Sequence, residues 1–303
     1  MNAITPNADR DKPRKVVNGL SVDVEDWFQV GAFEDVIERD NWAHLDDRVE
    51  RNTHEVLALF DEAGVSATFF TLGWVAQRHG PLMRAIVDAG HEVASHGWDH
   101  QRVFNLGQEA FAEDIAKARG VLEDATGQKV VGYRAPSFSI DHRTPWAFEE
   151  LAEQGYLYSS SVAPVSHDHY GWADAPRFAF NPLPGSDLVE LPVTTAMFGG
   201  KRMAAGGGGF FRVLPYAFTR WAIRQVNRDE GRPAMFYFHP WEIDPGQPRV
   251  AGAPIKSRLR HYTNLDRMAD KLRQLVHDFA WGRVDHIAQS EAARLSIEAK
   301  EAA

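Results

Sequence analysis

The stretch HEVASHGWDH, residues 91–100, is the one on which the interpretation of the whole chain depends. A short apolar run leads into it, Ser95 and Gly97 introduce a turn, and His96 and His100 lie four residues apart. This pattern predicts a strand that ends in one helical turn, on which both imidazoles share a face and can bind one metal ion. Two of the 13 histidines can also fall at this spacing by chance, so the neighbouring residues must distinguish the two interpretations.

Strand and helix patterns alternate on both sides of this stretch. Val16–Val24 is rich in β-branched residues, and Ser66–Leu72 is a nearly continuous apolar run, as in strands covered on both faces. Further strands are expected just before the histidines and at 129–133, 234–238 and 284–287. Helical spacing of apolar residues is found at 47–63, 81–89, 107–125, 144–154, 215–227 and 264–279. Strands separated by helices of this length indicate βαβ units and a mostly parallel sheet.

The domain organisation predicted from these patterns is simple. Residues 1–14 are expected to be a disordered leader, 15–290 a single domain, and 291–303 a tail rich in Ala and Glu. The segment 159–209 contains five prolines and four consecutive glycines, so we expect a long irregular region that contributes to a binding surface. No internal repeat and no linker interrupts the domain.

Composition narrows the class of protein. The chain has 303 residues, 44% of them hydrophobic, which is enough for a substantial core. Its net charge of -9 argues against nucleic acid or an anionic membrane as partner. It has no cysteine, so a metal ion must be held by His, Asp and Glu. The polar N-terminus lacks the apolar core of a secretory signal, and no apolar run is long enough for a membrane helix, which favours a cytoplasmic location.

Residues suited to metal binding and acid–base chemistry follow several of the predicted strands. They are Asp23, Glu25 and Asp26 at the carboxyl end of the first strand, His96 and His100, Arg134 after KVVGY, and His239 after AMFYF. Functional groups of parallel α/β sheets and barrels gather at these carboxyl ends. Two histidines and one carboxylate leave open positions on a catalytic ion such as zinc, and water on such an ion becomes a nucleophile near neutral pH. A remaining carboxylate then serves as general base and an isolated histidine as general acid.

At these residues the chain resembles the NodB-type polysaccharide deacetylases of carbohydrate esterase family four. The resemblance extends over about residues 16–290, as five short motifs in the family's order. SHGWDH contains the family's His-x-x-x-His metal motif, YRAP at 133–136 its Arg-x-Pro motif, and FYFHPW the closing motif with His239. The first motif, SVDVEDWF, lacks the usual adjacent Asp-Asp-Gly and resembles the Asp-x-Asp pair of bacterial peptidoglycan deacetylases.

Three further segments resemble a more specific subfamily. GYLYSSSVAP, GGGGFFRVLPY and HPWEIDPG are similar to a subfamily found with exopolysaccharide export loci that carry an exosortase. This similarity implies that 159–290 is a subfamily-specific C-terminal half. The family resemblance as a whole implies a distorted, incomplete (β/α) barrel.

The resemblance also implies roles for the residues of the first strand and their neighbours. Asp23 is the expected general base and Glu25 the expected metal carboxylate, with Asp26 as a competing ligand. Arg134 is expected to orient Asp23 and hold it in its charged form. The backbone N–H of Ser137, directly after the Arg-x-Pro motif, is the expected oxyanion donor.

His239 is the general acid that the resemblance implies, but one of its expected partners is missing. The family's fourth motif usually supplies an acid that holds this histidine, and here Ser159 or a neighbour replaces it. Glu242 and Asp141 are the two possible substitutes, and the sequence leaves the choice between them open.

Aromatic residues near the motifs are candidates for substrate binding. Trp27, Trp98 and Trp241 each lie within two residues of a motif, and either pack in the core or form an aromatic floor for a sugar ring. Pro136 and Phe138, in and beside the Arg-x-Pro motif, complete the expected substrate-binding set.

The function that the resemblance implies is hydrolysis of N-acetyl groups on amino sugars of a polysaccharide, with one divalent metal ion, zinc first among them. The expected partner is an N-acetylated polysaccharide or oligosaccharide. Two rivals remain: an amide hydrolase of small cyclic ureides, which can act without the two-histidine metal, and a non-catalytic carbohydrate-binding homologue. The intact pair His96 and His100 argues against the first, and the altered fourth motif leaves the second open. Fold alone does not separate the three.

Overall fold

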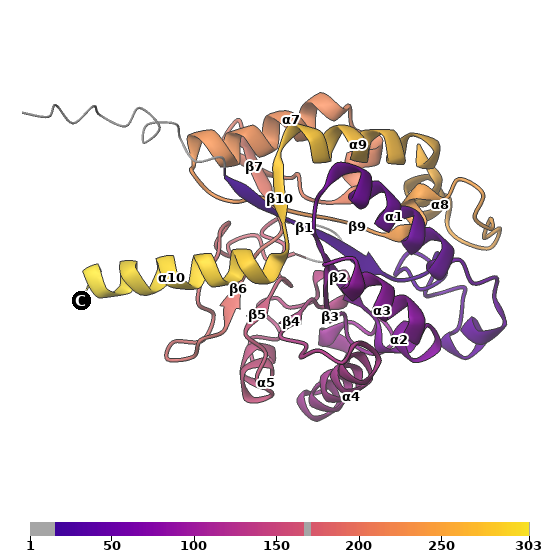
Figure 1. Cartoon of the computed structure of the whole chain (residues 1–303), viewed down its shortest axis with the longest axis horizontal. Coiled ribbons are helices and arrows are strands. Elements are labelled where there is room, and N and C mark those ends of the chain that lie inside the picture. Colours follow the sequence, from indigo (N-terminus) through magenta and orange to yellow (C-terminus); the bar gives the residue numbers. More distant parts are fainter. Residues whose placement is uncertain (1–15, 167–170, 303) are drawn as a thin grey trace, which may run out of the picture.

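The structure is a computed structural model that describes residues 16–166 and 171–302. The expected leader, 1–14, lies outside the described residues. Eight strands form one sheet in the order β10-β1-β2-β3-β4-β5-β6, with β9 paired to β1, and all of the pairs are parallel (Figure 1). The strands are β1 (Val17–Val24), β2 (Thr68–Thr71), β3 (Glu92–Ser95), β4 (Gly132–Tyr133), β5 (Tyr158–Ser159), β6 (Val189–Glu190), β9 (Met235–Phe238) and β10 (Ala280–Gly282).

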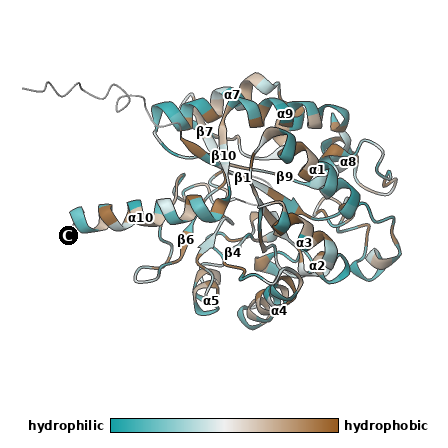
Figure 2. Ribbon diagram, viewed as in Figure 1, coloured by the Kyte–Doolittle hydropathy of each residue, from teal (hydrophilic) through white to brown (hydrophobic). Residues whose placement is uncertain are grey.

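Helices surround this sheet, as βαβ connections require. They are α1 (Val49–Ala63), α2 (Gly73–Arg78), α3 (Gly80–Asp88), α4 (Gln108–Thr126), α5 (Ala147–Glu153), α6 (Gly208–Val213), α7 (Tyr216–Arg224), α8 (Ile255–Tyr262), α9 (Met268–Asp278) and α10 (Val284–Ala302). Hydrophilic and hydrophobic residues alternate along many of these helices (Figure 2). Within the described ranges, no helix is long and apolar enough to cross a membrane.

Strand β1 is the centre of the sheet. Its sequence VNGLSVDV is buried at every position after Val17, and it pairs with β2, β9 and β10. The side chain of Asn18 links two of these partners, because its Oδ1 accepts the N–H of Ala234 at 2.8 Å and its Nδ2 donates to the carbonyl of Ala280 at 3.2 Å. The residues that follow β1 therefore lie in the middle of one end of the sheet.

The curled sheet is an incomplete barrel, and its opening lies between β6 and β9. No ladder joins these two strands, but Thr194, just after β6, donates its N–H to the carbonyl of Met235 at 3.2 Å. The Oγ1 of Thr194 also accepts the N–H of Met235 at 2.6 Å. A mostly parallel, incomplete barrel was expected from the sequence, and this architecture confirms it.

The C-terminal end differs from the sequence prediction. The expected strand at 284–287 is wrong: the last strand is β10, and α10 begins at Val284. Val284 and Ile287 are buried, and they lie three residues apart on one face of the helix, so their apolar character reflects helical rather than strand burial. The helix continues without a break past 291, which is therefore no structural boundary.

The region 159–209 is less irregular than the sequence suggested. It contains the antiparallel hairpin of β7 (Thr195–Phe198) and β8 (Lys201–Ala204). Gly199 and Gly200 form its turn with φ values of 55° and 77°, which two-residue hairpin turns require and glycine adopts readily. The helices α2, α6 and α8 were also not predicted.

Candidate active site

Three buried side chains at the carboxyl ends of β1 and β3 form a candidate metal group. Glu25 directly follows β1, His96 directly follows β3, and His100 lies four residues further on. The possible ligand atoms of these three residues all lie within 4.8 Å of one another. The structure thus brings together the two histidines and the carboxylate that sequence analysis selected as metal ligands.

The segment 96–100 reaches this arrangement without the expected helical turn. It forms a bend, and the chain reverses through left-handed conformations at Gly97 (φ 74°) and His100 (φ 61°). The prediction of a helical turn is therefore wrong, although the two imidazoles do lie together, with ring centroids 5.6 Å apart. Glycine tolerates such a conformation, whereas a non-glycine residue such as His100 rarely adopts it.

Hydrogen bonding fixes the orientation of His96. Its Nδ1–H donates to the carbonyl of Arg134 at 2.8 Å, which leaves Nε2 available on the other side of the ring. Burial lowers the pKa of His96 to about 4, so its imidazole is neutral at physiological pH. A neutral imidazole with a bonded second nitrogen is the form that binds metal ions.

The environment of Glu25 fits a cation. Burial raises the pKa of its carboxyl, but the nearby His100 and His239 more than offset this and hold the pKa at about 2. Oε2 of Glu25 lies 2.9 Å from Nε2 of His100, yet it accepts no hydrogen bond of adequate geometry from any described residue. A buried carboxylate oxygen without a hydrogen bond is costly unless a cation balances it. Two imidazoles and a carboxylate are the ligands of many divalent ions, so these residues fit one.

Asp26 points its carboxylate elsewhere. Its Oδ2 accepts the backbone N–H groups of Arg48 at 2.6 Å and Val49 at 2.9 Å, and its Oδ1 accepts that of Trp27 at 2.7 Å. It therefore satisfies the start of α1, whose first N–H groups have no partner within the helix. Of the two carboxylates proposed as metal ligands, the structure brings Glu25 and not Asp26 to the histidines.

Asp23 is held by a fixed arginine, as the sequence suggested. Nη1 of Arg134 donates to Oδ1 of Asp23 at 2.6 Å and to Oγ of Ser21 at 2.7 Å. The other side of the guanidinium donates to the carbonyl of Ser160 at 3.0 Å and to its Oγ at 2.9 Å. All of these residues are buried, so neither Asp23 nor Arg134 can reorient freely. Ser160 of the altered fourth motif thus holds the arginine in place.

The carboxylate partner of His239 is Glu242, three residues further along the chain. Its Nδ1–H donates to Oε1 of Glu242 at 2.8 Å, and its Nε2 lies 3.6 Å from Oε1 of Glu25. Burial lowers the pKa of His239, but Glu25 and Glu242 raise it overall to about 9. The alternative partner, Asp141, is instead paired with Arg143 at 2.5 Å.

Arg212 is a buried member of this site that sequence analysis missed. Its Nε donates to Oε2 of Glu242 at 2.5 Å, and its other nitrogens donate to backbone carbonyls of Arg260, His261 and Thr263. Burial raises the pKa of Glu242, but Arg212 and His239 lower it overall. No local pattern in GGFFRV signals this contact, which joins residues 30 positions apart.

Trp241 lies at the centre of the site. Its Nε1–H donates to Oε1 of Glu25 at 3.3 Å. Its ring stacks on His239, with centroids 5.0 Å apart, and on His261, with centroids 4.1 Å apart. Trp241 is only 6% exposed, so it orients Glu25 and His239 rather than offering an open face to a sugar.

The other two tryptophans are not brought to the metal group. Trp27 is buried and donates its Nε1–H to the carbonyl of Asp46 at 2.8 Å. The ring of Trp98 lies under Nζ of Lys117, 3.4 Å from its centroid, on the helical side of the barrel. Trp27 therefore packs in the core, whereas Trp98 is half-buried, and its role in substrate binding stays a prediction.

The loop after β4 carries the remaining predicted residues. Ser137 and Phe138 adopt left-handed conformations with φ values of 55° and 51°, directly after the buried Pro136. The ring of Phe138 packs on Tyr237, with centroids 4.7 Å apart. Left-handed conformations at two successive non-glycine residues are uncommon and often mark functional loops. The roles of these residues in binding and catalysis stay predictions.

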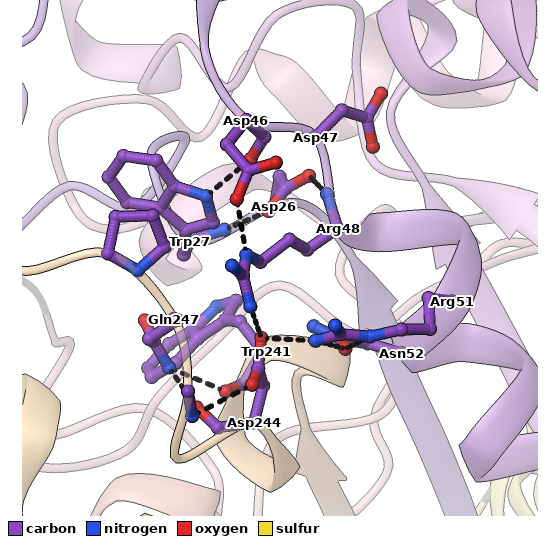
Figure 3. A network of polar contacts seen from close by, with 12 residues as sticks. Asp26, Trp27, Asp46, Asp47, Arg48, Arg51, Asn52, Trp241, Asp244 and Gln247 are labelled. Carbon is purple, nitrogen blue, oxygen red and sulfur yellow. Dashed lines mark hydrogen bonds and ion pairs between the residues drawn. The ribbon is translucent and has the colours of Figure 1, made fainter.

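A network of polar contacts next to the site joins the start of α1 to the segment that carries Trp241 (Figure 3). Arg48 and Arg51, at the start of α1, both bind Oδ2 of Asp244, at 3.2 and 2.7 Å. Asp244 directly follows the turn η5 (Pro240–Ile243), and Nε2 of Gln247 donates to the carbonyl of Trp241 at 2.8 Å. The segment that carries Trp241 is thereby fixed against the helix that Asp26 caps.

Comparisons with known proteins agree with this architecture. Residues 37–157 match the family model described as polysaccharide deacetylase, and residues 160–289 match a domain of unknown function (DUF3473). A peptidoglycan deacetylase-like protein of Gibberella zeae is 32% identical over 115 residues, which cover 37% of this chain and 32% of that protein. The peptidoglycan deacetylase of Helicobacter pylori is 31% identical over 107 residues, 35% of this chain and 36% of that protein. The chain thus matches about a third of the length of each relative.

Solved structures show the same fold. A candidate polysaccharide deacetylase from Mycobacterium smegmatis superposes with a TM-score of 0.59 at 22% identity, over 96% of both chains. Another, from Pseudomonas aeruginosa PAO1, gives a TM-score of 0.53 at 18% identity, over 78% of this chain and 71% of that one. The matches to polysaccharide deacetylases thus cover part of the chain, and the solved structures show that the chain shares their fold.

Proposed function

We propose that this chain is a metal-dependent hydrolase that removes N-acetyl groups from amino sugars of a polysaccharide. One observation carries the proposal. The Asp23–Arg134 pair, the group of Glu25, His96 and His100, and His239 lie at the carboxyl ends of parallel strands of one sheet, and His239 lies 3.6 Å from Glu25. A base, a cation site and an acid around one point are what amide hydrolysis requires.

The metal ion and the neighbouring residues have separate roles in the proposed reaction. Glu25, His96 and His100 would hold a divalent ion, and such an ion would supply positive charge that acidifies water and polarises the acetyl carbonyl. Asp23, fixed by Arg134, takes the proton of the attacking water. The N–H of Ser137 donates to the carbonyl oxygen as negative charge develops on it.

His239 completes the reaction by protonating the nitrogen of the sugar as the C–N bond breaks, so that acetate and a free amine leave. Glu242 supports this role, because it accepts the Nδ1–H of His239 and directs Nε2 toward the site. The contact between Glu242 and His239 also argues against the non-catalytic alternative, because Glu242 takes the place of the acid that the fourth motif lacks.

The finer assignments rest on chemistry and resemblance. Zinc is the ion that we propose, because two imidazoles and one carboxylate suit it. Exopolysaccharide biosynthesis is the setting that we propose, because the segments GYLYSSSVAP and HPWEIDPG resemble the subfamily of the export loci.

Metal analysis combined with acetate release tests the proposal. The purified protein is expected to hold one divalent ion per chain and to release acetate from at least one of a panel of N-acetylated glycans. A cyclic ureide serves as the comparison substrate. Turnover of the ureide alone, or no metal and no acetate release from any glycan, would overturn the proposed function.

A further inference from the structure

Helix α8 directs apolar side chains into solvent instead of burying them. Ile255 and Leu259 are 74% and 64% exposed, among the most exposed large hydrophobic side chains that the structure describes. They lie four residues apart, so they form one ridge along the helix. The buried residue of α8 is His261, on the opposite side. Helices of globular proteins normally place their apolar stripe toward the core, so this ridge is suited to a partner.

Basic residues lie on both sides of this ridge. Helical spacing places Lys256 and Arg260 along one side of it and Arg258 along the other, and all three are exposed. Together with Arg249 they are the charged residues of 245–265, a segment without Asp or Glu. The net charge of the whole chain, -9, argued against an anionic membrane as partner, but this segment has a local charge of the opposite sign.

The other side of α8 is fixed to the candidate active site. The ring of His261 stacks on Trp241, with centroids 4.1 Å apart. Nη2 and Nη1 of Arg212 donate to the carbonyls of Arg260 and His261, at 3.1 and 3.0 Å. The same guanidinium binds Glu242. A partner bound to the outer side of α8 therefore lies close to the candidate site.

The combination of charge and apolar surface identifies the class of partner. Lys and Arg side chains attract any polyanion, whether a soluble polymer or a layer of phospholipid headgroups. Ile255 and Leu259 gain free energy only where the partner also has an apolar interior that removes them from water. A bilayer with anionic headgroups offers both, because acyl chains lie directly beneath the charged layer.

We propose that α8 binds the surface of an anionic lipid bilayer. Ile255 and Leu259 enter between the headgroups, and the flanking Lys256, Arg258 and Arg260 contact lipid phosphates. Two apolar side chains and three charges give a reversible attachment, which holds the candidate site beside the bilayer. This inference goes beyond the proposed function and does not depend on it.

Co-sedimentation of the full chain with vesicles tests the proposal. Vesicles of phosphatidylcholine and phosphatidylglycerol in equal parts are compared with vesicles of phosphatidylcholine alone. We expect the partition coefficient to be at least about tenfold higher for the anionic vesicles and to fall as salt is added. Ile255→Ser with Leu259→Ser removes the ridge and keeps the charges, whereas Arg258→Gln with Arg260→Gln removes two charges and keeps the ridge. Each double variant is expected to lower the partition coefficient at least about fivefold.

Matched changes at other exposed positions are the controls. Ile297→Ser changes an apolar residue of α10 that is 58% exposed. Lys129→Gln with Arg228→Gln removes two exposed charges that precede β4 and β9, toward the amino ends of the strands. Both controls should bind anionic vesicles as the parent protein does.

Absence of binding to anionic vesicles by the parent protein would overturn the inference, and so would retention of binding by either double variant of α8. Loss of binding in Arg258→Gln with Arg260→Gln alone would indicate a soluble polyanion as partner. A dimer that Ile255→Ser with Leu259→Ser converts to a monomer without lipid would show that a second copy covers the ridge, and would also overturn it. Circular dichroism shows whether each variant is folded, and if one is not, the other decides. Vesicle binding needs no substrate, so a failure to release acetate would affect the proposed function alone.

Discussion

Two buried glutamates at opposite ends of the parallel sheet have opposite electrostatic environments. Glu25 follows the carboxyl end of β1, and Glu92 is the first residue of β3, at the amino end. They are 2% and 6% exposed. The pKa of Glu25 falls to about 2 because its histidine neighbours outweigh burial, whereas burial and the nearby Asp285 raise the pKa of Glu92 to about 7.

Their neighbours explain the difference. Glu92 accepts hydrogen bonds from the hydroxyls of Thr68 and Tyr158, the latter at 2.9 Å, and Asp285 repels its negative charge. Glu25 instead has histidines around it and an oxygen without a hydrogen bond. Burial alone therefore does not make a catalytic acid. A buried carboxylate is suited to a cation at the end where the strands direct imidazoles, and it is a structural acid at the other end.

Removal of a histidine ligand should have the largest effect at the carboxyl end. His96→Ala is expected to abolish both the bound metal and the activity, because two remaining ligands hold a divalent ion poorly. Metal analysis and acetate release measure the two losses together. His142→Ala, at a side chain that is 70% exposed, is the matched control. Unchanged metal content in both His96→Ala and His100→Ala would show that this end of the sheet holds no metal.

Glu25 and Asp26, the two acids that follow β1, can be compared in the same way. Glu25→Ala is expected to weaken metal binding, whereas Asp26→Ala should retain the metal and destabilise the start of α1 by about 1 kcal/mol, as loss of a helix cap does. Equilibrium dialysis and urea unfolding measure the two effects. Metal loss in Asp26→Ala with retention in Glu25→Ala would reverse the ligand assignment.

Asp23→Asn should separate the base from the ligands. The amide keeps the shape of the side chain but cannot take a proton, so we expect about 10²- to 10⁴-fold lower kcat with metal content unchanged. Steady-state kinetics on an N-acetylated oligosaccharide and metal analysis measure this. A parallel loss of metal would mean that Asp23 is a ligand.

His239→Ala should have a smaller and substrate-dependent effect. A sugar amine leaves poorly unless it is protonated, whereas the phenolate of p-nitrophenyl acetate needs no proton. The loss of activity is therefore expected to be about 10²-fold on the N-acetylated sugar and much smaller on the ester. Glu242→Gln should reproduce part of this loss, and Asp141→Asn should not, since Asp141 is paired with Arg143. Equal losses on both substrates would argue against a role as general acid.

Glu92→Gln should have the smallest effect on activity and should change stability instead. Since folding raises the pKa of Glu92 from 4.5 to about 7, its carboxyl contributes full stability below about pH 4.5 and loses it as the pH rises through 7. The loss amounts to at most about 3 kcal/mol. Relative to the parent protein, the variant should therefore be more stable at pH 8 than at pH 5. Urea unfolding at the two pH values measures this difference, and a constant difference would contradict the assigned environment.

Sequence analysis predicted the parts of the site that follow strands in fixed order. Asp23, Glu25, His96, Arg134 and His239 could be selected because strand ends and short motifs mark them. Their approach to one another follows from the parallel topology, which periodicity also predicts.

The parts of the site and the fold that sequence analysis could not predict depend on contacts between segments far apart in the chain. The choice of Glu25 over Asp26 follows from the capping of α1, 22 residues further along the chain. Arg212 reaches Glu242 from GGGGFFRVLPY, a segment in which nothing marks the arginine as a partner of Glu242. The helical turn at His96 and the strand at 284–287 were predicted from spacing and composition, and left-handed residues and tertiary burial overruled both.

The pairing of β1 with β9 and β10 has a consequence for how the protein acquires its site. Trp241 and Glu25, which touch, are 216 residues apart in the sequence. Synthesis on the ribosome completes β1 and the histidines long before β9 and β10 emerge, so the central strand waits with one of its edges unpaired. Such long-range pairing makes folding slow and exposes strand edges to other chains. Cellular yield of this protein is therefore expected to depend on chaperones and on the rate of translation of its last third.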